Sequence, residues 1–507
     1  MSIVGRDDRG IVINTMADPF DSVVAIDKRV LGKDTPDVGS GIIVGPNEVL
    51  TAGHVLFGGE GARITLGQNI SLSNFPSRTQ TPLTMADDNV SKSDFNYLVP
   101  GYNGGVGGDD IALATSSQTF TTDQQMGLVA FVNPGDANGR TVTTAGYPAA
   151  VETINLQTSN NEPFLIRDQN GNLSEPAEYA FGGFQTDALV QFTATGTIDS
   201  TKSDGEFNLS PEIDIEPGQS GSGYWTVIEG DTLPRVLGVV SYQINTIGMG
   251  GIRVYPGDNF GALITTDIYD RIVAAMLKNN PNLSGNDLPE NAIIGTDSER
   301  FRNLQRGGKD NIFGSFRRER IIGQGGNDRL FGGGGDDRLD GGKGVDQAFF
   351  SDEFKNYTLN IDPLSTVFGL PLSRVFEFDH TSGTQTDGKD ATKDIEFGVF
   401  EFVDANNDGN DDDGNLFFVP LQVDPKNKKK LKDGPEITPE KNILDRDGKI
   451  IGTVTVESPA WTFDGNIDYT LTIGSEQSLV HNFAYIVDKS GSMRGGALHG
   501  RSKPIKP

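Results

Sequence analysis

The sequence predicts an all-β protein of several domains, and three observations support this fold class. First, residues 20–275 consist of short β-branched runs separated by Gly, Pro, Asn and Asp, the pattern of strands and turns. Second, residues 305–349 repeat a Gly- and Asp-rich pattern every nine residues. Third, 507 residues are too many for one hydrophobic core. We therefore expect a β-barrel or β-sandwich domain, then a repetitive region and further β-rich segments.

One helix interrupts this pattern, over residues 265–280 ("TTDIYDRIVAAMLKNN"). Its apolar residues recur at helical spacing, and the following "NNPN" is a stop signal. We expect this helix to close the first domain.

Composition restricts the partners. The chain carries 70 Asp and Glu against 42 Lys and Arg, a net charge of -28. Such a charge disfavours nucleic acid and anionic membrane surfaces as partners and suits a protein that binds cations. There are no cysteines, which excludes disulfides, thiolate metal sites and a Cys nucleophile.

No apolar run is long enough to span a bilayer, so no transmembrane segment is predicted. The first 20 residues also lack the apolar stretch of a secretory signal peptide. The protein either stays inside the cell or leaves by a route that uses another signal.

The stretch "PGQSGSG" (217–223) offers a candidate nucleophile, Ser220. A serine hydroxyl needs a base within hydrogen-bond reach, and the base needs an orienting carboxylate. Of the four histidines, only His54 precedes the serine in the same β-rich region, at the end of a strand in "VLTAGHVL". Asp110 in "DDIALA" directly precedes a short apolar run, where a buried orienting carboxylate belongs, whereas Asp109 reads as a turn residue.

The glycines around Ser220 also provide for an oxyanion hole. They let the backbone turn the N–H groups of Gly218 and Ser220 toward one point. An α/β-hydrolase elbow would require G-x-S-x-G, but position 222 is Ser and no helical pattern follows.

The blocks "GSGIIV…VLTAGHVL", "DDIALA" and "PGQSGSG" resemble, in this order, the catalytic blocks of the chymotrypsin-like serine peptidases. The resemblance implies a trypsin-like domain of two β-barrels that hydrolyses protein or peptide substrates. It makes His54 the general base, Asp110 its orienting residue and Ser220 the nucleophile. Ser222 corresponds to a position without a catalytic role.

The stretch "EIDIEPGQSGSG" is similar to the bacterial glutamyl-endopeptidase branch, in which Gln or Asn precedes the nucleophile, as Gln219 does here. The resemblance places the specificity pocket near residues 213–217 and 238–243. Glu preference usually requires a pocket His, which this chain lacks there, whereas Asp214 stands where a trypsin-like pocket would bind Lys or Arg. Acidic and basic preference both remain open. The expected pocket residues are Asp214, Ile215, Val240 and Ser241.

The repeat at 305–349 follows G-G-x-G-x-D-x-U-x, where U is apolar. Glycines permit tight turns with convergent carbonyls, the sixth-place acid suits Ca²⁺, and the apolar eighth residue points into a narrow core. The second unit, "GSFRRERII", has Arg317 and Arg318 in its turn, and we expect no full site there. The eighth residues are Ile312, Ile321, Leu330, Leu339 and Ala348. The expected metal ligands are Asp310, Asn327, Asp328, Asp336, Asp337 and Asp346.

A flexible Gly/Asp linker would not keep five units in register, so we favour a folded repeat. The pattern resembles the RTX β-roll of secreted bacterial proteins. This resemblance implies a parallel β-roll that binds Ca²⁺ as its cofactor and folds outside the cell. It further implies a secreted or cell-surface protein exported by a type I system.

Two later stretches are weaker metal candidates. "DANNDGNDDDGN" (404–415) matches the front of an EF-type loop, but its twelfth residue is Asn415, and a solvated acidic turn explains it equally well. "FAYIVDKSGSM" (483–493) looks like the start of a von Willebrand factor A domain, with Asp488, Ser490 and Ser492. Only 14 residues follow Met493, too few for that domain, so we assign no metal there.

Together these features predict a secreted, calcium-stabilised serine endopeptidase, with a calcium-binding surface adhesion protein as the alternative. In that alternative the protease-like domain only binds. The expected parts are an N-terminal segment or propeptide (1–19), the protease domain (20–280), a linker (281–304), the β-roll (305–349), a β-rich capping region (350–423), a second linker (424–441) and a partial β domain (442–507).

Overall fold

The fold is given by a computed structural model, which divides the chain into two compact units. The first unit comprises residues 1–283 and 287–289, and the second comprises 284–286 and 290–507. The structure describes residues 10–12, 14–67, 83–148, 166–168, 173–174, 191–209, 213, 215, 218–229, 231–243, 259–286, 288–296, 310–344, 346–352, 356–362, 375–401, 416–420, 440–444, 450–456 and 469–473.

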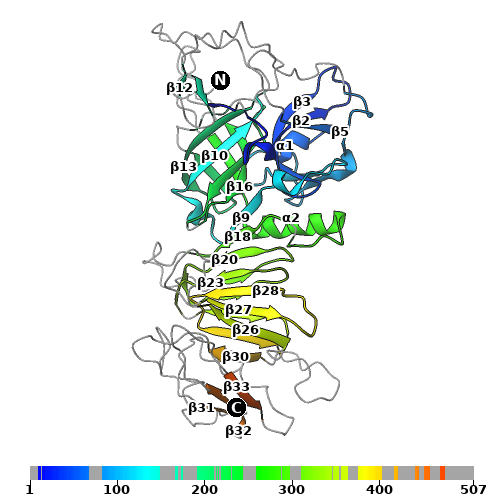
Figure 1. The fold of residues 1–507 in the computed structure, drawn as a ribbon. Helices are drawn as coiled ribbons and strands as arrows, with labels where there is room; N and C mark the ends of the chain where they lie inside the picture. Colours follow the sequence, from blue (N-terminus) through cyan, green and yellow to red (C-terminus); the bar gives the residue numbers. More distant parts are fainter. Residues whose placement is uncertain are drawn as a thin grey trace. The chain divides into compact units, whose positions relative to one another are not determined.

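The first unit begins with an antiparallel sheet of seven strands (blue and cyan in Figure 1) in the order β6-β5-β2-β3-β4-β8-β7. Its strands are short apolar runs whose side chains, such as Val24, Ile42 and Leu113, are fully buried. The helical turn α1 (Gly53–Leu56) follows β4 directly. The strands are β2 (Val23–Arg29), β3 (Asp37–Ile43), β4 (Glu48–Thr51), β5 (Gly61–Leu66), β6 (Val90–Ser91), β7 (Phe95–Tyr97) and β8 (Ala112–Thr115).

The second sheet of this unit closes on itself through antiparallel pairs in the order β13-β10-β15-β16-β17-β14-β13. The closed ring encloses a core that includes Phe207, Tyr224 and Leu237. The expected all-β fold with two barrel-like sheets is thus confirmed. The strands of the ring are β10 (Thr141–Gly146), β13 (Phe192–Thr201), β14 (Glu206–Leu209), β15 (Gly223–Val227), β16 (Pro234–Gln243) and β17 (Asn259–Leu263). Strands β1 (Gly10–Ile11), β9 (Gly127–Phe131), β11 (Ile166–Asp168) and β12 (Leu173–Ser174) extend this sheet outside the ring.

The predicted helix is present as α2 (Thr266–Asn279). The Thr265 side chain accepts a hydrogen bond from the Ile268 N–H and caps the helix. One face, which includes Ile268, Ile272 and Met276, is buried. Four short 3-10 helices complete the unit: Phe20–Ser22, Lys92–Asp94, Thr122–Gln124 and Pro134–Ala137.

The second unit contains the predicted parallel β-roll, seen as the stacked green and yellow strands of Figure 1. Consecutive repeats alternate between two sheets. In one sheet Ile312 pairs with Leu330, which pairs in turn with Ala348, and in the other sheet Ile321 pairs with Leu339. All five apolar eighth residues are buried. The strands are β18 (Asn291–Ile294), β19 (Asn311–Phe313), β20 (Glu319–Ile322), β21 (Gly325–Gly326), β22 (Arg329–Phe331), β23 (Arg338–Asp340), β24 (Lys343–Gly344) and β25 (Gln347–Phe350).

The expected capping region does more than cover the roll. After the antiparallel hairpin β26 (Tyr357–Asp362) and β27 (Val375–His380), the chain rejoins both sheets. Strand β28 (Lys389–Lys393) pairs parallel with β23, and β29 (Phe397–Glu401) pairs parallel with β25. The remaining strands are β30 (Leu416–Pro420), which pairs with β29, and a separate sheet of β31 (Glu440–Leu444), β32 (Ile450–Val456) and β33 (Tyr469–Ile473).

Two predicted features lie outside the described residues: the acidic loop at 404–415 and the D-x-S-x-S stretch at 483–493. Among the residues that the structure does describe, no helix is long and apolar enough to cross a membrane.

Candidate functional site

His54 and Asp110 are joined by two contacts. The short helix α1 begins at Gly53, so the His54 backbone N–H points out of its first turn and donates to Asp110 Oδ1 (2.8 Å). The His54 ring Nδ1 lies 2.7 Å from Asp110 Oδ2. With a proton on Nδ1 the ring donates to the carboxylate, which leaves Nε2 as the basic nitrogen.

Asp110 is fully buried, and several donors keep it ionised. Burial favours the neutral acid, but the hydrogen bond and charge of His54 and the hydrogen bond of Ser241 outweigh it, and the pKa of Asp110 lies below its ordinary value. Ser241 Oγ donates to Oδ2 (2.6 Å) and Tyr102 OH donates to Oδ1 (2.7 Å). An anionic, fully bonded carboxylate can orient and stabilise an imidazolium.

The Ser220 loop rests on strand β3 of the first sheet. Ser40 holds it twice: its N–H donates to the Ser220 carbonyl and its Oγ donates to the Gly218 carbonyl, both at 2.8 Å. Gly221 has a φ of +83° and Gly218 one of +94°, which glycine adopts readily. A Cβ atom placed on Gly221 would lie 2.1 Å from Thr51 Oγ1, so the loop can approach only through glycine.

These contacts bring the nucleophile loop next to the helix that carries His54. Thr51 lies three residues before His54, and Gly39 lies between Val55 and the Ser220 carbonyl. A Cβ atom on Gly39 would lie 2.5 Å from Val55 Cγ1 and 3.3 Å from the Ser220 carbonyl oxygen. In this part of the chain no hydrogen bond joins Ser220 Oγ to His54, a bond that often tightens only when substrate is bound.

The loop also presents two free backbone donors. Within the described residues the N–H groups of Gly218 and Ser220 donate to no acceptor, whereas those of Gly221 and Ser222 donate to Val240 and Gln219. Free N–H groups on the nucleophile itself and two residues before it are what an oxyanion hole requires.

The second serine of the stretch occupies a different environment. Ser222 is fully buried, and its Oγ has no hydrogen-bond partner. It packs against Gly146, where a Cβ atom would lie 1.9 Å from this oxygen. Ser220 is therefore the better candidate nucleophile of the two.

The predicted pocket residues are only partly described. Ile215, Val240 and Ser241 are buried, and Asp214 lies outside the described residues. Ser241 has a contact that the sequence did not indicate, its hydrogen bond to Asp110. The specificity pocket therefore stays a prediction.

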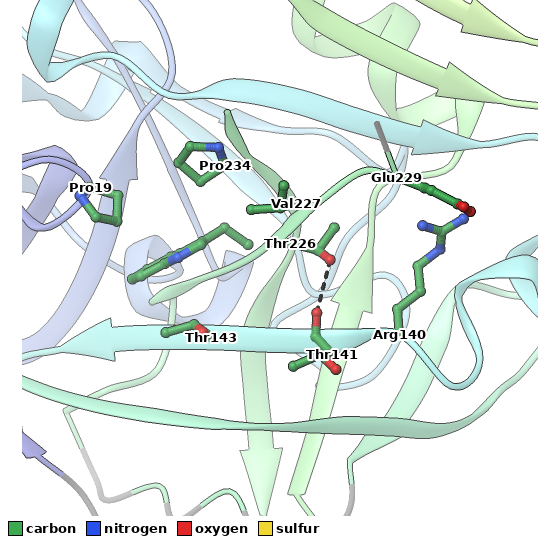
Figure 2. Close-up of a pocket in the computed structure, with 9 residues that line it drawn as sticks. Pro19, Arg140, Thr141, Thr143, Thr226, Val227, Glu229 and Pro234 are labelled. Atoms are coloured by element: carbon green, nitrogen blue, oxygen red, sulfur yellow. Dashed lines mark hydrogen bonds between the residues drawn. The ribbon is translucent and has the colours of Figure 1, made fainter. Parts of the chain in front are cut away.

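A pocket of about 590 Å³ lies elsewhere in the first unit, between β10 and β15 (Figure 2). Thr226 Oγ1 donates to the Thr141 carbonyl (2.8 Å) across its floor, and Arg140 and Glu229 point toward each other at its side. Its lining includes none of His54, Asp110 and Ser220, and we assign it no chemistry.

The Tyr102 hydroxyl is a testable contributor to this site. Tyr102→Phe should lower kcat/KM roughly 10- to 100-fold if the site hydrolyses peptides, because a hydrogen bond to a charged group contributes about 1.5–3 kcal/mol. The ring would still pack, stacked on Tyr97 and edge-on to Phe57. The pH profile of kcat/KM should shift as well, since Asp110 loses a donor. Tyr97→Phe is the matched control and should behave like the wild type; equal rates for both variants would exclude this role.

The acids of the repeat form two hydrogen-bonded series along the roll. Asp328 Oδ1 accepts from the Asp310 N–H (2.9 Å), and Asp346 Oδ1 accepts from the Asp328 N–H (2.8 Å). On the other side, Asp337 Oδ1 accepts from the Glu319 N–H (2.8 Å). Each acid thus fixes the turn one coil before it.

The second carboxylate oxygens carry the evidence for a cation. Oδ2 of Asp328, of Asp337 and of Asp346 is buried and has no hydrogen-bond partner among the residues that the structure describes. Burial raises the pKa of Asp328 to about 7 and that of Asp346 to about 9. Buried carboxylate oxygens without partners fit Ca²⁺, which takes oxygen ligands from carboxylates and carbonyls. Within the described residues no three acidic or His side chains form a metal cluster, so the carbonyls of the turns must contribute.

The other expected ligands have defined positions. Asp310 Oδ2 accepts from the Thr296 N–H, and Asp336 Oδ1 accepts from the Lys389 N–H. Asn327 lies against Gly344, which belongs to the next coil on the same side of the roll. A Cβ atom placed on Gly344 would lie 3.3 Å from Asn327 Oδ1.

The second nonapeptide of the repeat, "GSFRRERII", forms a different turn from the others, as its sequence indicates. Arg317 is fully buried, and the carboxylate of Glu319 accepts from both the N–H and the Oγ of Ser315. Both carboxylate oxygens of Glu319 therefore have protein donors. This arrangement supports the expectation that this turn holds no full calcium site.

The raised pKa values predict how a calcium-depleted roll responds to pH. The ordinary pKa of an Asp side chain is 3.8, and the pKa values of Asp328 and Asp346 in the folded roll are higher. The folded roll therefore binds protons more tightly than the unfolded chain. By linkage, the free energy of unfolding should fall as the pH rises from about 4 toward 9. Thermal melts of the calcium-depleted chain between about pH 5 and pH 8 measure this trend. A melting temperature that rises with pH over this range would contradict it.

Known proteins resemble two parts of this chain. The RTX calcium-binding nonapeptide repeat matches residues 313–348 in 4 copies, so this region consists of RTX repeats and calcium is the ion that such repeats bind. No curated protein sequence matches the chain. A solved structure of a Glu endopeptidase in complex with MPD is similar to 54% of this chain and 98% of its own length, with 19% sequence identity and a TM-score of 0.32.

Proposed function

We propose that the chain is a secreted serine endopeptidase stabilised by calcium. The first unit would cleave peptide bonds with Ser220, His54 and Asp110. The second unit would bind calcium through its RTX repeats. The observation that carries the proposal is the buried Asp110, which four donor groups bind, two of them from His54. Strand β3 holds the Ser220 loop next to the helix that carries His54.

In the proposed reaction, Ser220 Oγ attacks the carbonyl carbon of the scissile peptide bond, and His54 Nε2 takes its proton. Asp110 holds the Nδ1–H and stabilises the imidazolium. The N–H groups of Gly218 and Ser220 donate to the oxyanion of the tetrahedral intermediate. His54 then protonates the leaving amine, and an acyl-enzyme on Ser220 remains. Water attacks this ester with His54 as base, which releases the acid product and restores the serine.

The secreted location is part of the proposal and rests on the repeats. Extracellular calcium modules bind the ion with Kd values of about 10⁻⁴–10⁻³ M. A roll with buried acids would stay unfolded at much lower free calcium and fold where calcium is abundant.

Cleavage profiling on a diverse peptide library at millimolar calcium tests the activity and the specificity together. We expect cleavage beside one class of charged residue. Cleavage after Lys or Arg would assign the pocket charge to Asp214, and Asp214→Asn should then reduce it. Cleavage after Glu or Asp would indicate the acidic preference of the similar endopeptidases. Absence of turnover would contradict the proposal and favour the calcium-binding adhesion protein.

A further inference from the structure

One turn of the roll, residues 332–337 ("GGGGDD"), stacks within the repeat on a turn for which we expect no full calcium site. The preceding coil on its side is the arginine-containing unit, where Arg317 is buried and Glu319 is bonded to Ser315. Asp337 is nevertheless built like a ligand: it is 1% exposed, and its Oδ2 has no partner. This oxygen points back into its own turn, where a Cβ atom on Gly332 would lie 2.4 Å from it.

The following coil on the same side comes from outside the repeat. Strand β28 pairs parallel with β23, with Arg338 opposite Ala391. Just before this pair, the Asp337 N–H donates to Asp390 Oδ1 (3.0 Å). This bond continues the series in which the Glu319 N–H donates to Asp337 Oδ1, although its partners are 53 residues apart instead of 18. Asp390 therefore occupies the sixth place of a further repeat.

The turn before Asp390, residues 385–390, stacks on residues 332–337. Gly388 lies on Gly335: a Cβ atom on Gly388 would be 2.2 Å from the Gly335 carbonyl oxygen. The Lys389 N–H donates to Asp336 Oδ1 (3.0 Å). Within the repeat, Gly342 approaches the Gln324 carbonyl in the same way, at 2.3 Å. The stretch "QTDGKDATK" keeps Gly at the fourth place and Asp at the sixth, and its eighth residue, Thr392, is buried.

The inserted hairpin holds this turn in place. The Asp387 carboxylate accepts from the Ser351 N–H (2.7 Å) and from the Tyr357 hydroxyl. The Asp387 N–H donates to Nδ1 of the buried His380 (3.3 Å), whose Nε2 lies 3.0 Å from Asp352 Oδ2. Asp387 is thus occupied by protein donors, which leaves Asp390 as the acid of this turn that can face an ion.

We propose that the turns 332–337 and 385–390 together bind one calcium ion, with Asp337 and Asp390 as carboxylate ligands and backbone carbonyls of both turns completing an oxygen shell. On the opposite side of the roll, where the chain also rejoins the repeat, a lysine ammonium group pairs with the acids. There the Gly341 N–H donates to the Lys393 carbonyl, and Lys393 Nζ pairs with Asp340 (2.7 Å) and Asp394 (3.4 Å). This calcium site lies in the second unit alone, and its occupancy does not depend on peptidase activity.

The test counts calcium ions bound to the full chain. Asp390→Asn keeps an Oδ1 acceptor for the Asp337 N–H but removes the charge. Titration of calcium into the calcium-depleted chain should show one ion fewer for Asp390→Asn than for the wild type. Asp379→Asn, on the neighbouring strand β27, removes the same charge outside the turn and should bind as many ions as the wild type. An unchanged number and affinity in Asp390→Asn would overturn the proposal.

Hydrogen–deuterium exchange on the wild-type chain covers the case in which the variant fails to fold. Calcium should slow exchange in the peptide that contains residues 385–390 as well as in the repeat at 323–346. Protection of the repeat without any protection of 385–390 would show that the ion binds elsewhere, and the proposal would be wrong.

Discussion

Replacement of Ser220 by Ala should abolish peptide hydrolysis, with a loss of roughly 10⁶-fold in kcat. Without its hydroxyl the site can form no acyl-enzyme, and only the oxyanion donors and substrate binding remain. The change should leave the fold intact, because the contacts of this residue to the barrel run through its backbone carbonyl. Hydrolysis of a substrate identified by library profiling, with a circular dichroism spectrum of the variant, measures both effects.

The neighbouring serine is the matched control for this variant. Ser222→Ala removes a buried hydroxyl without a partner, and the rate should stay within about 3-fold of the wild type. The two serines lie two positions apart in the same stretch, so non-specific damage to the loop would affect both variants. Activity retained in Ser220→Ala, or lost equally in both variants, would contradict the assignment of the nucleophile.

Removal of calcium should strongly destabilise the roll at neutral pH. The unpartnered oxygens of Asp328, Asp337 and Asp346 face their own turns, and without an ion the acids must either repel one another or take up protons. Each ion present at 100 times its Kd stabilises the folded state by about 2.7 kcal/mol, so several ions exceed the usual stability of a small domain.

Scanning calorimetry of the full chain, with calcium and with excess chelator, measures this effect. We expect the transition of the second unit to fall to a much lower temperature or disappear, with loss of its β-sheet circular dichroism. Readdition of calcium should restore it. Magnesium at the same concentration should not, since Mg²⁺ demands near-ideal octahedral geometry. Identical thermograms with and without calcium would contradict a calcium-stabilised roll.

Local patterns predicted much of this fold. The helix at 265–280 lies where its apolar spacing and stop signal place it, within a residue at each end. The nine-residue period predicted the buried core of the roll residue by residue. The closure of the second sheet could not be predicted from the sequence. It depends on the pairing of β14 with β17, two segments far apart in the chain, and no local pattern indicates such a pair.

The candidate site was predictable where a motif carried it. His54, Asp110 and Ser220 each stand in a recognisable block, and the structure brings the first two into contact. Tyr102 was missed because its contact with Asp110 depends on the course of the loop between β7 and β8. Asp390 was missed because the insertion breaks the period, although Gly388 and Asp390 keep two of its key places.

Labelling with a serine-directed phosphonate tests the central claim most directly. The reagent phosphonylates a serine only where a base and an oxyanion hole activate it, and peptide mass mapping then identifies the modified residue. We expect one label per chain, on Ser220, and none in a His54→Ala variant. A folded, calcium-loaded chain that takes no label, or takes it on another serine, would contradict the account.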